Sequence, residues 1–214
     1  MTCCFCGKES ISNIWCPEGH FFCTSCHSLS IIDFVAEIIK TSPSKNPFAL
    51  AAIMMAYPKL PGCSCEHAWI FTASVLTAVK NEGAVKLTID DIFKALRNVK
   101  KQIALDSEFK NNVCSIVPAV GIVFNTIFTA VGNGQDDTTM RVVAQATEYL
   151  ADNQLKCRCC KNQVWTTIGL LVSLLNARFG IQLDGSVEDV TCHLFKLVEN
   201  CSPATCPFST LYYD

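Results

Sequence analysis

The cysteines of this chain constrain its fold more than any other residue type. There are fifteen in 214 residues, an odd number that leaves at least one thiol unpaired in any disulfide scheme. Many stand in tight clusters, which in a chain without a visible secretory signal favour metal ligands or redox thiols over disulfides. We therefore expect a protein of the reducing cytoplasm. The clusters are Cys3, Cys4 and Cys6; Cys63 and Cys65; and Cys157, Cys159 and Cys160.

The rest of the composition is that of a folded, apolar chain. Hydrophobic residues make up 50% and charged residues 17%, which excludes a disordered protein, and the formal net charge of −2 argues against a general nucleic-acid binder. The apolar stretch 115–131 approaches the length of a membrane span, but Pro118, Gly121 and Asn125 interrupt it and no Lys or Arg flanks orient it. We interpret it as a buried central helix and expect no membrane association.

Residues 1–29 form a short unit, the knuckle, which is too small to bury a core and needs a metal to fold. Its two C-x-x-C pairs, Cys3 with Cys6 and Cys23 with Cys26, bring four thiolates to one tetrahedral ion. Zinc suits four thiolates and has no redox chemistry, so we predict a structural zinc ion here.

Within the knuckle, the stretch from Cys16 to Cys26 resembles the middle of a RING finger, a family in which two zinc ions are held in a crossed arrangement. The resemblance implies that Cys16 and His20 ligate a second ion. The last cysteine pair of a RING finger does not follow soon after. Either the second site is absent or the helical domain completes it.

The remainder of the chain, residues 30–214, is predicted to be all-α, a bundle of about eight helices. Ser30, Asn46, Thr88 and Ser186 are expected to cap helices, and Gly83 follows the end of one. The expected helices span about 31–41, 47–57, 65–81, 89–103, 115–131, 137–151, 160–179 and 187–200.

A second group of cysteines lies where these helices are expected to begin. Helix dipoles and unpaired N–H groups there stabilise thiolates and lower their pKa, and neighbouring Lys156, Arg158 and Lys161 would add to this effect. Glu66 lies beside His67 in the sequence, and such a pair can supply a general acid and base or an oxygen ligand for a metal. Cys192 is expected inside the last helix as a small core residue. The candidate catalytic residues are Glu66, His67, Cys159 and Cys160. The candidate cofactor ligands are Cys65, Cys114, Cys201 and Cys206.

Several of these segments carry a resemblance to a known family. The matching pieces are Cys23-Thr24-Ser25-Cys26-His27, Glu66-His67, Cys114 with Gly121, Arg158-Cys159-Cys160-Lys161, and Cys201 with Cys206-Pro207-Phe208. Across about residues 1–210 the chain resembles a cysteine-rich family of unknown function, best known from anaerobic bacteria and methanogenic archaea. Members show His-Gly-Pro-Glu-His-His where this chain has Cys63-Ser64-Cys65-Glu66-His67-Ala68. Cys63 therefore stands where members have a histidine, and both residue types can bind a metal. The resemblance implies no established activity.

Two classes of function follow from these patterns. In the first, the cysteines of the helical domain converge on a second metal ion, an iron–sulfur cluster or a redox dithiol. In the second, the protein is a non-enzymatic adaptor whose knuckle docks a protein partner. A metal sensor or carrier is a third reading, which predicts a readily exchanged second ion. The two main readings differ in geometry, because an adaptor has no need to bring Cys159 and Cys160 close to Glu66 and His67.

Overall fold

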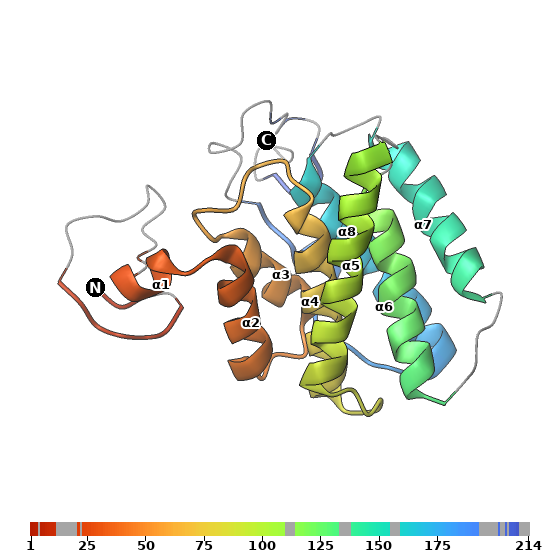
Figure 1. The fold of residues 1–214 in the computed structure, drawn as a ribbon, viewed down its shortest axis with the longest axis horizontal. Coiled ribbons are helices and arrows are strands. Elements are labelled where there is room, and N and C mark those ends of the chain that lie inside the picture. Colours follow the sequence, from red (N-terminus) through yellow and green to blue (C-terminus); the bar gives the residue numbers. More distant parts are fainter. Residues whose placement is uncertain are drawn as a thin grey trace.

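The computed structural model is an all-α bundle with the knuckle at one edge (Figure 1). It describes residues 1–3, 5–11, 21, 23–109, 114–132, 138–154, 159–192, 201, 204 and 206–209. Within them there are eight α-helices and one 3-10 turn. These are α1 (Thr24–Ser28), α2 (Ile31–Thr41), α3 (Pro47–Met55), α4 (Glu66–Glu82), α5 (Ile89–Phe109), α6 (Ile116–Ala130), α7 (Thr138–Gln154), α8 (Cys160–Phe179) and η1 (Val187–Asp189).

The helix starts predicted at Ser30, Asn46 and Thr88 are confirmed by their capping contacts. The Ser30 hydroxyl accepts the backbone N–H of Asp33 at 3.1 Å at the start of α2. Thr88 and Asp91 form a reciprocal capping box at the start of α5, because each side chain accepts the backbone N–H of the other residue. These contacts involve residues only three apart, so the sequence alone is enough to place them.

The fully surrounded helix of the bundle is α4, which packs against α2, α3, α5, α6 and α8. Its polar side chains can be buried because they return hydrogen bonds to their own helix: Thr72 donates to the carbonyl of Ala68 at 2.8 Å, and Ser74 to that of Phe71 at 3.0 Å. The prediction that 115–131 is the central helix is therefore only half right. That stretch forms α6, which is buried on one side and leaves Asn125 and Thr129 exposed. In the described part of the chain, no helix has the length and hydropathy needed to cross a membrane.

The predicted last helix, about 187–200, is wrong where the structure can test it. Ser186 caps only the 3-10 turn η1, and Cys192 then forms a parallel bridge with Ser209. The β-branched residues Val190 and Thr191 disfavour a continued helix, and the bridge takes the Cys192 N–H, which donates to the Phe208 carbonyl. Residues 193–200 lie outside the described part. The bridge holds the C-terminal segment against the bundle, where the ring of Phe208 lies 5.3 Å from that of Trp165.

Candidate metal centres

The knuckle presents its first two cysteines on a tight turn. Thr2 and Glu9 pair in an antiparallel bridge, and the Gly7 N–H donates to the Cys3 carbonyl at 3.0 Å. Gly7 has φ +69°, a left-handed conformation that glycine adopts without steric cost. The other pair, Cys23 and Cys26, opens the short helix α1, with Cys23 at its N-cap position. Each C-x-x-C pair therefore sits on one local turn, as the spacing predicted.

The four knuckle sulfurs converge as a metal site requires. All four lie within 4.8 Å of one another, and the Sγ atoms of Cys6 and Cys23 are 3.6 Å apart. Zinc–sulfur bonds of about 2.3 Å in a tetrahedron place the sulfurs about 3.8 Å apart, so the group has the size of a mononuclear site. Cys3, Cys23 and Cys26 are buried and Cys6 is exposed. The sequence-predicted set of Cys3, Cys6, Cys23 and Cys26 is thus brought together.

Backbone N–H groups prepare part of this site for negative charge. Burial raises the pKa of Cys3, but the N–H groups of Cys6, Cys23 and Phe5 outweigh it and hold that pKa at about 6. The N–H of Cys23 donates to Cys3 Sγ at 3.3 Å. The pKa of Cys26 is raised, first by burial and then by the neighbouring sulfurs. Four thiols this close resist simultaneous ionisation unless a cation joins them.

An aromatic stack fastens the knuckle to the helical body. The ring of Phe5 lies 4.5 Å from that of Phe34 in α2, which stacks at 4.2 Å on the ring of Tyr57. The Tyr57 hydroxyl donates to the carbonyl of Leu29 at 2.5 Å. Lys59 donates to the same carbonyl at 3.2 Å. The knuckle is therefore packed against α2 and the segment after α3.

Cys16 and His20, predicted as ligands of a second zinc ion, lie outside the described residues. The RING resemblance rests largely on the same stretch, since 12–20 and 22 are also outside them. The knuckle described here is a single four-thiol group.

The second group of cysteines meets at one end of the bundle. Eight thiols arrive from the segment before α4, the start of α6, the start of α8 and the C-terminal segment, and their charges act on one another. No disulfide joins any two of the twelve described cysteines. The eight are Cys63, Cys65, Cys114, Cys159, Cys160, Cys192, Cys201 and Cys206. Cys63 and Cys192 were not among the predicted cofactor ligands, and Cys192 enters the group because its segment is extended.

Cys160, the first residue of α8, and Cys114, which precedes α6, lie between these two helices. Cys114 donates to the Gln163 side-chain oxygen at 3.0 Å. The sulfur of Cys160 is contacted by the backbone of Ser64, in the turn before α4. The starts of three helices are thus joined around these two thiols.

Cys159 and Cys206 lie on the side of α8 that faces the C-terminal segment. The Asn162 amide donates to Cys206 Sγ at 3.5 Å. The charge of Cys206 acts on Cys159, and Cys201 interacts with both. Cys159 and Cys206 are buried, and Cys201 is half-buried.

His67 lies at the same end of the bundle with one ring nitrogen engaged. Its Nδ1 lies 3.1 Å from the Ser64 carbonyl and 3.3 Å from the Ser64 hydroxyl, and its buried Nε2 has no hydrogen-bond partner among the described residues. Burial lowers the pKa of His67 to about 4, an effect that Lys161 reinforces while the Ser64 carbonyl and Glu66 oppose it. Burial therefore favours the neutral imidazole. Glu66 is half-exposed in the first turn of α4.

Lys161 is the functional candidate that sequence reasoning undervalued. It was predicted only as a nearby cation, yet it is 6% exposed and donates to the Met55 carbonyl at 3.3 Å. Burial lowers its pKa, and the charges of Cys192, Cys159 and Cys63 oppose that change. A lysine is almost never buried without compensation. The signal was present in the sequence as a cation beside paired cysteines at a helix start.

The predicted lowering of thiol pKa is wrong for the three thiols at the starts of α6 and α8. Burial raises the pKa of Cys114 and of Cys159, and it raises that of Cys160 to about 12. Backbone N–H groups of the first helical turn oppose this, as the dipole argument expected, but they are the smaller effect. The pKa of Cys201 is also raised by burial.

The second group is wider than the knuckle site. In the described ranges, only the knuckle brings three or more ligand atoms within 4.8 Å of one another. The eight thiols are close enough to interact electrostatically but are not arranged around a single tetrahedral point.

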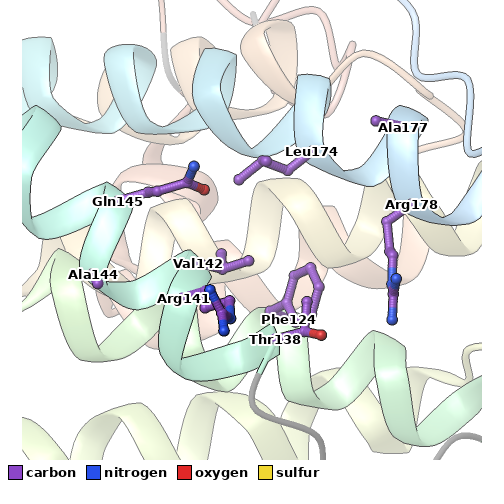
Figure 2. A pocket seen from close by; sticks show the side chains of 9 residues that line it. All are labelled: Phe124, Thr138, Arg141, Val142, Ala144, Gln145, Leu174, Ala177 and Arg178. Atoms are coloured by element: carbon purple, nitrogen blue, oxygen red, sulfur yellow. The ribbon is translucent and has the colours of Figure 1, made fainter.

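A pocket between α6, α7 and α8 lies apart from the thiols. It has a volume of about 530 Å³ and is lined by Phe124, Leu174, Arg141, Arg178 and neighbouring residues (Figure 2). No cysteine, histidine or carboxylate is among its lining residues. The thiols and this pocket are therefore separate features.

The comparisons with known proteins add a family but no activity. The sequence model of a family of unknown function, DUF5714, matches residues 35–209. That range includes all eight thiols of the second group and begins after the knuckle. No curated protein and no solved structure matches the chain.

Proposed function

Because the chain belongs to the DUF5714 family, whose function is unknown, we propose its function from its own residues: it is a metal-binding protein with a structural zinc ion and a second, thiolate-ligated metal centre. The knuckle would hold the zinc through Cys3, Cys6, Cys23 and Cys26. The helical body would hold the second metal at the end of the bundle where the eight thiols meet.

Zinc in the knuckle is supported by donor type and spacing. Four sulfurs within 4.8 Å match a tetrahedral ion, and zinc prefers a closed four-thiolate set in structural sites. The ion would supply folding free energy and no chemistry, since all four positions are filled by protein sulfur. It would replace the thiol protons and remove the repulsion among four adjacent thiolates.

The second centre is supported by one observation above all: eight thiols from four separate segments lie at one end of the bundle, and the charges of three of them, Cys63, Cys159 and Cys192, act on the buried Lys161. Small core cysteines have no reason to be concentrated in this way, because their packing role can be filled anywhere in the core. Thiolates select soft metals, including iron in iron–sulfur clusters, and Lys161 would offset the negative charge of such a centre. A free thiol–disulfide function does not suit Cys159, Cys192 and Cys206, because these three are buried and exchange needs an accessible sulfur.

The same geometry bears on the adaptor reading. The Ser64 backbone contacts both Cys160 and His67, so the paired cysteines lie near the Glu66-His67 pair. An adaptor would not need this proximity.

A metal centre with so many unoxidised thiols belongs in a reducing compartment, and we propose the cytoplasm.

Metal and sulfide analysis of protein purified anaerobically tests this function. We expect one zinc ion per chain from the knuckle and additional metal in the helical body. Cys26→Ser should remove the zinc alone, and Cys114→Ser with Cys160→Ser should lower the additional metal alone, so each variant serves as the control for the other. One zinc and no other metal in the wild-type protein would refute the second centre.

A further inference from the structure

The first turn of α8 divides the second group of thiols. Cys159 occupies the N-cap position of this helix and Cys160 its first helical position. Consecutive positions at a helix start point in different directions, whereas residues three apart share a face. Cys160 therefore shares a face with Gln163, and Cys159 shares one with Asn162.

The contacts of these two polar side chains show where each face points. Gln163 accepts a hydrogen bond from Cys114, at the start of α6. Asn162 donates to Cys206, in the C-terminal segment. The two adjacent cysteines of α8 thus face two different groups of thiols.

The thiols on the α6 side, here called the outer set, are Cys63, Cys65, Cys114 and Cys160. The charges of Cys63 and Cys114 act on Cys160, and the charge of Cys65 acts on Cys114. The adjacent Cys159 also acts on Cys160, so the two sets are neighbours. Cys63 and Cys65 are exposed, and the other two are half-buried. This set is open to solvent through the segment before α4.

The thiols on the C-terminal side, here called the inner set, are Cys159, Cys192, Cys201 and Cys206. The charges of Cys159, Cys206 and Cys192 all act on Cys201. Three of the four are buried and Cys201 is half-buried. Lys161 interacts with Cys159 and Cys192 of this set, and with Cys63 of the outer set, whose charge also acts on Cys159.

We propose that the second centre is two centres, each held by four thiolates, with the inner one buried beside Lys161 and the outer one open to solvent. The inference rests on the proposed metal-binding function and refines it. Four cysteines are the number that an iron–sulfur cluster or a tetrahedral ion takes.

The spacing of the thiols in the two sets does not match a single tetrahedral ion. A tetrahedral ion needs sulfurs about 3.8 Å apart. In the described chain no three ligand atoms outside the knuckle come within 4.8 Å of one another. A metal–sulfide core occupies the middle of its site and keeps the thiolates farther apart. The inner centre, with a buried cation beside it, is the better suited to a cluster that carries net negative charge.

The test compares pairwise variants of the full-length protein after anaerobic reconstitution with iron and sulfide. Cys192→Ser with Cys206→Ser removes two inner ligands, Cys65→Ser with Cys114→Ser removes two outer ligands, and Cys26→Ser in the knuckle is the control. We expect each pair to lower the iron and sulfide content by about half and the control to leave both unchanged. Loss of all iron from either pair alone would overturn the division into two centres, while the proposed function would stand.

A second measurement on the wild-type protein covers the case in which a variant does not fold. An iron chelator should remove iron in two phases of similar amplitude, with the open outer centre released first. A single phase would overturn the division. Absence of any metal beyond the knuckle zinc would instead overturn the proposed function, so the two failures are distinguishable.

Discussion

Replacing Phe34 with alanine should break the packing that joins the knuckle to the helical body. Phe34 is fully buried in α2, and its ring lies between those of Phe5 and Tyr57 at 4.5 and 4.2 Å. Truncating a buried phenylalanine costs about 3–5 kcal/mol, of which each ring pair accounts for about 0.5–1.5 kcal/mol. For a chain of this size, about 4 kcal/mol corresponds to a fall in melting temperature of roughly 8–16 °C.

Thermal and urea unfolding of the zinc-loaded protein measure this loss, with Ile32→Ala as the control. Ile32 belongs to the same helix but is 48% exposed, so its replacement should change stability by less than about 0.5 kcal/mol. A double-mutant cycle of Phe5→Leu with Phe34→Leu should give a coupling of about 0.5–1.5 kcal/mol. A loss below about 1 kcal/mol for Phe34→Ala, or zero coupling, would refute the view that this stack fastens the knuckle.

Three further substitutions test other contacts. Thr88→Ala removes a helix cap and should cost about 1 kcal/mol at pH 7 by urea unfolding. Hydrogen bonds from Thr88 hold the pKa of Asp91 below its usual value, so this difference should shrink as the pH falls below about 4, and a constant difference would contradict it. Gly121→Ala places a Cβ 2.9 Å from Val143 Cγ2, so its helix-propensity gain of about 1 kcal/mol should appear in melting curves only when Val143 is also replaced by alanine. Lys161→Met should raise the melting temperature of the metal-free protein by removing a buried charge, at about 1 kcal/mol or more, and lower that of the metal-loaded protein. Equal shifts in both forms would argue against a charge-balancing role.

Features that depend on residues close together in the sequence could be predicted from it. The helix starts at Ser30, Asn46 and Thr88 were predictable because a cap and its partner lie within three or four residues. The first knuckle pair was predictable for the same reason, since Cys3-x2-Cys6 closes on a single turn.

The errors came from long-range contacts. The segment after Ser186 carries a good cap, but Cys192 pairs with Ser209 in place of continuing a helix. The central position of α4 was hidden by Thr72 and Ser74, whose hydroxyls are satisfied within the helix and so do not need solvent. The raised thiol pKa values follow from burial, which depends on how distant segments pack and not on the position of a cysteine in its helix.

The limits of the family match indicate which of the two proposed metal sites to examine first for a shared function. The match over 35–209 begins inside α2 and ends at Ser209, which pairs with Cys192, so it takes in all eight thiols of the second group and none of the four knuckle ligands. The matched range therefore makes the helical body, with its thiols and Lys161, the place to look first for a function common to the family. The knuckle would then act on that body only through packing, by way of Phe5 and Tyr57. It follows that Cys26→Ser should lower the thermal stability of this chain while leaving the metal content of the helical body unchanged. A parallel loss of both metals, measured by elemental analysis of the folded variant, would show instead that the knuckle and the thiol-rich end of the bundle form one coupled unit.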